Sequence, residues 1–159
     1  MNKYSISEVM EMAVQTERLG YQFYTTMAEK FKKDDGLVKL FSTLAEKEKA
    51  HERAFTRLKD AVMEQAAEPA GWSDVSDYLR AFVESEFFLG RGKSLPSMER
   101  IKTIRDAVHF ALGFEKETLL YYMELLPIVR EKAPLETLIS EEKSHVVWLE
   151  RFKTGLPKQ

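Results

Sequence analysis

Two copies of the pattern Glu-x-x-His stand out, "EKAH" at Glu48–His51 and "EKSH" at Glu142–His145. Residues three apart share one face of a helix, so each pattern places a carboxylate beside an imidazole. Carboxylate and imidazole groups are suitable ligands for iron and manganese. The chain has three histidines, and two of them belong to these patterns. The patterns therefore predict a metal site.

Two further glutamates, Glu17 and Glu115, interrupt apolar stripes that recur every three to four positions in other segments. An offset of 98 residues separates them, and an offset of 94 separates the two Glu-x-x-His patterns. A tyrosine follows each lone glutamate by seven residues, at Tyr24 and Tyr122. We interpret the chain as two similar pairs of helices, which an approximate two-fold axis relates to each other.

This symmetry would bring four carboxylates and two imidazoles together in the core. Uncompensated buried carboxylates cost several kcal/mol each and repel one another, whereas two divalent cations would balance four of them. The predicted metal ligands are Glu17, Glu48, His51, Glu115, Glu142 and His145. The alternative is a set of solvated or internally satisfied side chains. For Tyr24 and Tyr122 the alternatives are core packing and hydrogen bonds to ligand carboxylates.

Helices must carry these residues, because no segment shows sustained strand-like alternation. Four long helices are predicted at about 5–31, 37–65, 98–127 and 134–153, with a shorter one at about 75–88. Ser5 with Glu8 is typical of a capping box, and Asp34 or Asp35 can cap the second long helix. The fold class is therefore all-α, a four-helix bundle. The long, helix-containing connection at about 68–97, with "LGRGKSLPS" as a loop, permits a crossover between helices 2 and 3.

Composition limits the other functions. The 159 residues suit a single domain, 1–159, and are 44% hydrophobic with a net charge of -2. The sequence lacks the surplus of basic residues that would predict a nucleic-acid partner. It also lacks the long apolar run that would predict a membrane span or a signal peptide. Cysteine is absent, which favours a reducing cytoplasmic location. His109 falls off the ligand face and is expected to be a structural or surface residue.

With these six positions, the chain resembles the ferritin-like superfamily and, within it, the rubrerythrin-type di-iron domain. The resemblance covers nearly the whole chain. It implies two bound iron ions, with manganese or a mixed pair as the alternative. It also implies that Glu48 and Glu142 bridge the metals, that Glu17 and Glu115 are terminal ligands, and that the two pattern histidines bind one metal each.

Two departures from that family pattern concern electron supply and ligand exchange. Many rubrerythrins carry a four-cysteine rubredoxin domain, whereas this sequence has no cysteine. A separate protein or reductant is therefore expected to supply the electrons, and a rubredoxin-like protein is one candidate. Rubrerythrins also place a second carboxylate one turn from the helix 3 ligand. Here the residues three positions either side of Glu115 are Leu112 and Thr118. This difference weighs against the family's peroxidase cycle but not against metal binding.

Three functions follow from the resemblance, in order of preference. The first is a non-haem di-iron oxidoreductase of the peroxidase or ferrous-oxidase type, which reduces hydrogen peroxide or O2 while Fe(II) is oxidised. The second is an iron-binding protein for storage or delivery, and the third is a structural or sensor helical bundle. A homodimer is compatible with the superfamily.

Overall fold

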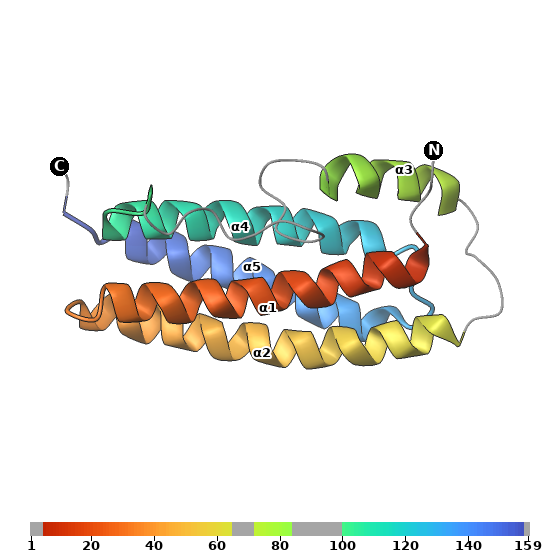
Figure 1. The fold of residues 1–159 in the computed structure, drawn as a ribbon, viewed down its shortest axis with the longest axis horizontal. Coiled ribbons are helices and arrows are strands. Elements are labelled where there is room, and N and C mark those ends of the chain that lie inside the picture. The colour runs from red at the N-terminus through yellow and green to blue at the C-terminus, as the bar shows by residue number, and fades with distance from the viewer. Residues whose placement is uncertain (1–4, 65–71, 84–99, 158–159) are drawn as a thin grey trace.

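The computed structural model describes residues 5–64, 72–83 and 100–157, and these residues form helices and turns. Figure 1 shows the helices in chain order. They are α1 (Ile6–Lys30), α2 (Asp35–Met63), α3 (Trp72–Val83), α4 (Ile104–Leu125) and α5 (Lys132–Thr154). The described part of the chain contains no strand, which confirms the predicted all-α class.

The beginnings of the helices follow local capping. Ser5 and Glu8 form the predicted capping box of α1, and the side chain of Asp34 accepts from the backbone N–H of Leu37 at the start of α2 (2.8 Å). The predicted start of the third long helix was wrong. Position 98 lies outside the described residues, and α4 begins only after Thr103, which forms a second capping box with Asp106. The capping box satisfies backbone N–H groups at the start of α4, which have no carbonyl partner within the helix.

The other boundaries agree more closely with the sequence pattern. The helix α3 begins at Trp72, three residues before the predicted start, while the predicted helix ends at 65 and 88 and the loop at 89–97 lie outside the described residues. The helix α4 ends at Leu125, just before Pro127, whose ring disfavours continuation of the helix. Pro134 lies in the first turn of α5, where a missing N–H costs nothing.

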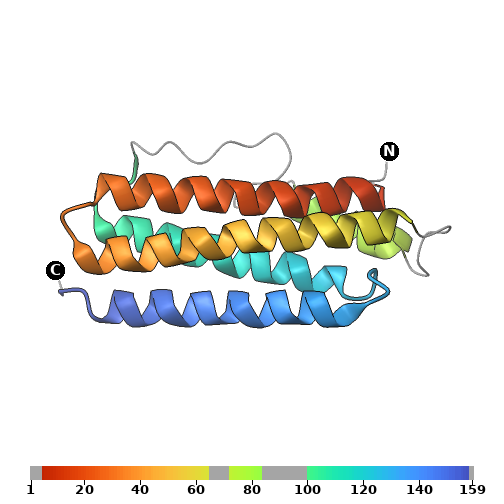
Figure 2. The same ribbon diagram turned by 90° about the horizontal axis from the view of Figure 1, so that it is seen from below.

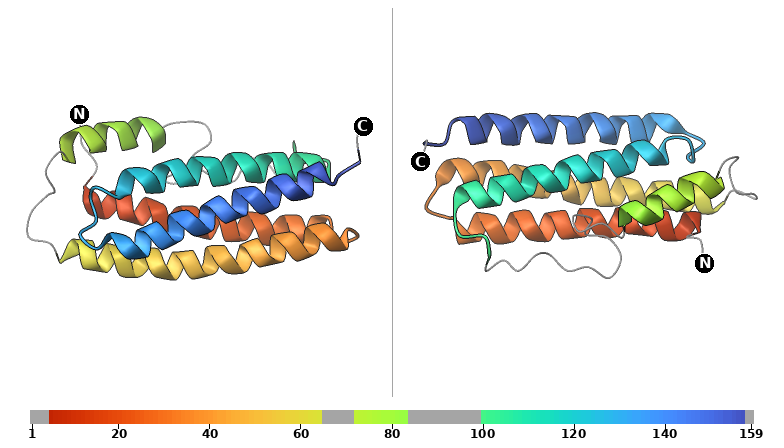
Figure 3. Two further views of the ribbon diagram at one scale, coloured as in Figure 1. Left: turned by 180° about the vertical axis from the view of Figure 1, so that it is seen from behind. Right: turned by 90° about the horizontal axis from the view of Figure 1, so that it is seen from above.

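The four long helices form the predicted bundle with the predicted crossover. The helices α1 and α2 are antiparallel, as are α4 and α5 (Figure 2). The helix α2 ends where α1 begins, whereas α4 begins at the opposite end of the bundle, so α2 and α4 run parallel (Figure 1). The helix α3 belongs to the connection and packs on α4, as Figure 3 shows from two further sides. In this arrangement α1 packs against α2 and α4, and α5 packs against α4 and α2.

The apolar core is divided into two clusters, one toward each end of the bundle. One cluster includes Met10 of α1, Phe55 of α2 and Leu125 of α4. The other includes Phe41 of α2 and Leu149 of α5. On every long helix the six predicted ligands lie between the residues of the two clusters. A layer of buried acids and imidazoles therefore crosses the middle of the bundle.

No helix in the described residues combines the length and the apolar character that crossing a membrane requires.

Candidate metal centre

All six predicted ligands are buried in the middle of the bundle. Each long helix supplies one glutamate, and α2 and α5 each add a histidine one turn later. Five of the six side chains are 0% exposed and His51 is 1% exposed. The structure therefore brings together residues that are up to 128 positions apart, Glu17 and His145 being the extremes.

The ligand atoms form two overlapping groups of four residues, each with its atoms within 4.8 Å of one another. The first group is Glu17, Glu48, His51 and Glu142; the second is Glu48, Glu115, Glu142 and His145. Glu48 and Glu142 belong to both groups, as the predicted bridging carboxylates would. Each group is completed by one terminal glutamate and one histidine, which makes the arrangement suitable for two neighbouring cations.

Both histidines turn Nδ1 toward the carboxylates. Nδ1 of His51 lies 2.6 Å from Oε1 of Glu142 and 3.6 Å from Oε2 of Glu17. Nδ1 of His145 lies 3.1 Å from Oε2 of Glu142 and 3.3 Å from Oε2 of Glu115. The two imidazole rings stack with their centroids 5.4 Å apart and their planes 14° apart. Nδ1 is thus the nitrogen that each histidine would present to a metal held between these carboxylates.

Gly20 on α1 leaves room for one of the shared carboxylates. A Cβ atom at this position would lie 2.6 Å from Oε2 of Glu48 and 2.9 Å from the ring of Phe114. Real Cβ atoms do not approach other atoms so closely, so α1 and α2 can hold Glu48 in this position only with glycine here. Sequence reasoning did not identify Gly20, because its role depends on the neighbouring helix.

The two tyrosines hydrogen-bond to the terminal glutamates of the opposite half. The hydroxyl of Tyr24 on α1 donates to Oε1 of Glu115 on α4, and the hydroxyl of Tyr122 on α4 donates to Oε1 of Glu17 on α1. Both tyrosines are 0% exposed. The sequence left open whether these tyrosines only pack in the core or hydrogen-bond to the predicted ligand carboxylates. The structure has the hydrogen bonds.

Outside the six, Glu141 contacts the site directly. Its Oε2 lies 2.7 Å from Nε2 of His51, and its Oε1 lies 3.1 Å from Nζ of Lys47. Sequence reasoning did not identify the contact with His51, because Glu141 lies beside the apolar stripe of its own helix. Only the position of α2 shows the contact with His51.

Burial and mutual repulsion govern the protonation of the metal-free cluster. Desolvation raises the pKa of Glu48 well above its ordinary value and that of Glu17 above it, with repulsion from the other carboxylates adding to both shifts. Desolvation and the charge of Glu142 raise the pKa of Glu115 to about 8. The metal-free site therefore retains protons that free carboxyl groups would have lost at neutral pH.

The pKa values of the two histidines are raised and that of Glu142 is lowered, so each of these groups favours its charged form. Burial opposes the imidazolium form, but the neighbouring carboxylates, which accept from an imidazolium N–H, outweigh it and raise the pKa of His51 to about 11 and that of His145 to about 10. Burial likewise opposes the ionised form of Glu142, yet Glu115 and both imidazoles hold its pKa below the ordinary range. In the metal-free protein, Glu142 is thus the carboxylate that the imidazoles stabilise.

Several polar atoms of the cluster lack a partner with hydrogen-bond geometry, although some lie within ion-pair distance of each other. These atoms are Oε2 of Glu17, both Oε atoms of Glu48, Nδ1 of His51, both Oε atoms of Glu142 and Nε2 of His145. Unpartnered buried carboxylate oxygens are rare, since each carries the full cost of desolvation. All but one of these atoms belong to the set that could bind metal, so the residues present fit a pair of divalent cations.

The residues three positions from Glu115 offer no extra ligand. Leu112 is 4% exposed and Thr118 is 1% exposed, and neither belongs to the two groups. By the offset of 98, Thr118 corresponds to Gly20 of α1. The expected departure from the rubrerythrin pattern therefore lies at a buried position beside the site.

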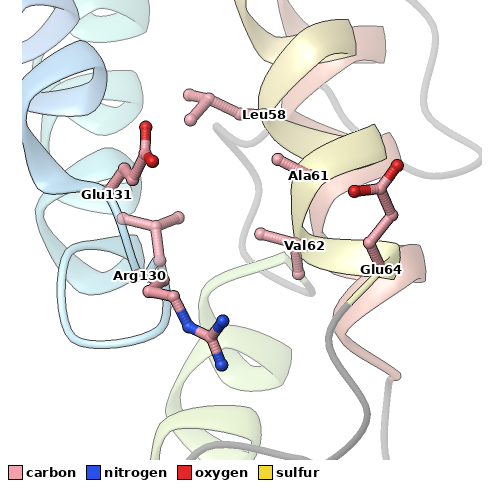
Figure 4. Close-up of a pocket in the computed structure, with 7 residues that line it drawn as sticks. Leu58, Ala61, Val62, Glu64, Arg130 and Glu131 are labelled. Atoms are coloured by element: carbon pink, nitrogen blue, oxygen red, sulfur yellow. The ribbon is translucent and has the colours of Figure 1, made fainter.

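Two surface pockets in the described residues lie away from this cluster. Figure 4 shows one of about 290 Å³ between the end of α2 and the turn before α5, where Leu58 and Val62 face Arg130 and Glu131. A second pocket, of about 400 Å³, lies along α4 and α5 and is lined in part by His109. His109 is exposed, as expected of a surface histidine. Neither pocket is lined by any of the six predicted ligands.

Two comparisons with known proteins found similarities, one in sequence and one in fold. The family model for rubrerythrin matches residues 8–89, a segment that includes Glu17, Glu48 and His51. The fold is similar to that of a ferritin-like diiron-carboxylate protein from Thermotoga maritima, with a TM-score of 0.70 and 22% sequence identity over 98% of each chain. No curated protein sequence matches the chain significantly. At this identity the structural likeness concerns the fold.

Proposed function

This chain belongs to the rubrerythrin family, and from that premise we propose that it is a di-iron oxidoreductase that reduces hydrogen peroxide or O2. The observation that carries the proposal is the pair of overlapping four-residue groups that share Glu48 and Glu142. Carboxylate-rich sites with one imidazole per metal suit iron, and manganese is the alternative ion.

Each residue of the cluster has a role in holding the ions. Glu48 and Glu142 would bridge them, because each contributes to both groups. His51 with Glu17 would complete one position, and the corresponding histidine and glutamate of the second half would complete the other. Two Fe(II) ions held by these residues would supply one electron each, which together with two protons is enough to reduce one hydrogen peroxide molecule to two molecules of water.

The surrounding residues keep this chemistry ordered. The six ligands are at most 1% exposed, so the bundle excludes bulk water from the reacting centre. Burial and nearby carboxylates raise the pKa of Tyr24 and Tyr122 well above the ordinary value, so both hydroxyls keep their protons. As permanent donors they hold Oε1 of the terminal glutamates in a fixed orientation.

Re-reduction of the centre requires an external electron source. The sequence contains no cysteine, so none of its residues can form a thiolate-ligated iron centre. We propose that a separate, rubredoxin-like protein donates the electrons in a reducing compartment such as the cytoplasm.

The test is anaerobic reconstitution with Fe(II), followed by rapid mixing with peroxide or with O2. We expect about two iron ions per chain, and iron oxidation much faster than in solution, as followed by the absorption of the oxidised centre. The Glu48→Ala, His51→Ala double variant should lose both properties, while Glu46→Ala on the same helix should keep them. Equal oxidation rates in the wild type and the double variant would contradict the proposal.

A further inference from the structure

The two halves of the site match on the side that faces the carboxylates but differ on the outer side of the histidines. Nε2 of His51 lies 2.7 Å from a carboxylate oxygen of Glu141. Nε2 of His145 is buried and has no hydrogen-bond partner, and the ring of Trp148 packs against this imidazole with centroids 5.5 Å apart. Since both histidines present Nδ1 to the carboxylates, only the outer nitrogen distinguishes them.

The difference originates in one pair of equivalent positions. The offset of 94 residues that relates the two Glu-x-x-His patterns also relates Lys47 to Glu141. By this symmetry Lys47 occupies the place from which a side chain would reach His145. An ammonium group only donates hydrogen bonds, so it cannot accept from an imidazole N–H. Lys47 instead pairs with Glu141, with Nζ 3.1 Å from Oε1.

This contact determines how well His51 can act as a ligand. An imidazole that binds metal through Nδ1 carries its proton on Nε2, and an acceptor at Nε2 fixes that tautomer and the orientation of the ring. A carboxylate acceptor also makes the ligand nitrogen more basic. His145 has neither advantage, because its Nε2–H would remain buried without an acceptor.

We propose that Glu141 is a positioning residue that makes the two metal positions unequal, so that the position completed by His51 binds its ion more tightly. The inference rests on the proposed function only in that the cluster must bind two divalent cations. It predicts sequential loading, with the position next to His51 filled first.

Mn(II) binding to the chelator-treated protein tests this directly, with free Mn(II) measured by electron paramagnetic resonance. We expect two binding constants in the wild type. In Glu141→Ala the tighter constant should weaken by roughly 10- to 100-fold while the weaker one stays within about threefold. Unchanged constants in this variant would overturn the inference. Circular dichroism reports folding, and if Glu141→Ala does not fold, Glu141→Gln, which keeps an oxygen acceptor without the charge, should weaken the same constant by a smaller factor.

A double-mutant cycle separates contact through His51 from a general effect of negative charge. In a His51→Ala background, Glu141→Ala should produce no further loss of Mn(II) affinity. In a His145→Ala background it should produce the same loss as in the wild type. A loss that persists without His51 would show that Glu141 acts by its charge alone and would overturn the assignment.

Lys47 provides the complementary experiment. By the offset of 94 residues, Lys47→Gln would offer His145 an oxygen acceptor from the position equivalent to Glu141, whereas Lys47→Ala removes the ammonium group without supplying one. We expect the weaker constant to tighten in Lys47→Gln relative to Lys47→Ala, and equal constants in these two variants would count against the symmetry argument. Absence of any Mn(II) or Fe(II) binding to the wild type would refute the proposed function itself. Two equal binding constants, unaffected by Glu141→Ala, would refute only this inference.

Discussion

Tyr122 donates a hydrogen bond to the carboxylate of Glu17, 105 residues earlier in the chain. The same contact recurs in the other direction, from Tyr24 to Glu115, across 91 residues. Each half of the chain thus fixes the predicted terminal carboxylate of the other half. Exact two-fold symmetry would produce this reciprocal exchange, and it connects α1 to α4 at the level of the site.

Replacing either tyrosine with phenylalanine should weaken the site without disturbing the fold. In Tyr24→Phe, Oε1 of Glu115 loses its donor, and we expect a loss of roughly 10- to 100-fold in metal affinity or in the rate of Fe(II) oxidation. Mn(II) binding and rapid-mixing kinetics measure the two effects. Tyr121→Phe is the matched control, since its hydroxyl donates to the backbone carbonyl of Val9. An equal loss in the control would show that the effect is one of packing.

Gly20→Ala should displace Glu48, because the new methyl group would lie 2.6 Å from Oε2 of that carboxylate. We expect a cost of about 1–3 kcal/mol in unfolding free energy from overpacking, together with a loss of metal binding. Denaturant unfolding and Mn(II) binding measure these quantities. Gly113→Ala on α4 is the control, since a Cβ there meets no atom within 4 Å, and it should stabilise the helix by about 0.5–1 kcal/mol.

The metal-free protein should lose stability as the pH rises. The folded protein holds protons at Glu115 up to a pKa of about 8 and at His51 up to about 11, above the ordinary values of 4.5 and 6.5. The folded state therefore binds more protons than the unfolded state between these limits, and stability falls as pH rises through them. Glu142, with its lowered pKa, opposes this trend only below its ordinary value of 4.5.

Thermal denaturation of the chelator-treated protein tests the direction of this pH dependence. We expect a higher Tm at about pH 5.5 than at about pH 8.5. Saturating Mn(II) should reverse the slope, because the ligands must lose protons to bind the ion. A Tm of the metal-free protein that rises over this range would contradict the expectation.

The capping box of α4 should affect stability but leave the chemistry of the site intact. Thr103→Ala removes the side-chain oxygen that accepts from the backbone N–H of Asp106 (3.0 Å). We expect a loss of about 0.5–2 kcal/mol in unfolding free energy, with Mn(II) affinity unchanged, because the cap lies three turns before Glu115. Parallel denaturant and binding measurements decide the matter, and a large drop in affinity would show that the start of α4 helps to place its ligand.

The sequence predicted the burial of the six clustered acids and imidazoles because periodicity reports directly on which face of a helix is buried. Glu17 and Glu48 were identified as misplaced charges on apolar stripes, and their burial is confirmed. The start of α4 was misplaced because Met98 and Ile101 extend the apolar spacing backward, and spacing outweighed the Thr103 cap. A cap is a local contact that periodicity does not register.

Residues that act across helices escaped the sequence-based interpretation. Gly20 is an ordinary small residue until α2 places Glu48 against it. Glu141 fell beside the stripe of its own helix, and only the position of His51 reveals its contact. Such roles depend on distances between segments, whereas a single sequence supplies distances within one segment.

The acidic layer that separates the two apolar clusters has a mechanical consequence. Each end of the bundle has its own apolar cluster. Without cations, the layer of ionisable side chains between the clusters is where the packing between the two ends is least stable. Bound metal would connect all four long helices at this layer, so that the two ends of the bundle unfold as one cooperative unit. Amide hydrogen exchange should then show the ends of the long helices opening independently in the stripped protein and together in the loaded one.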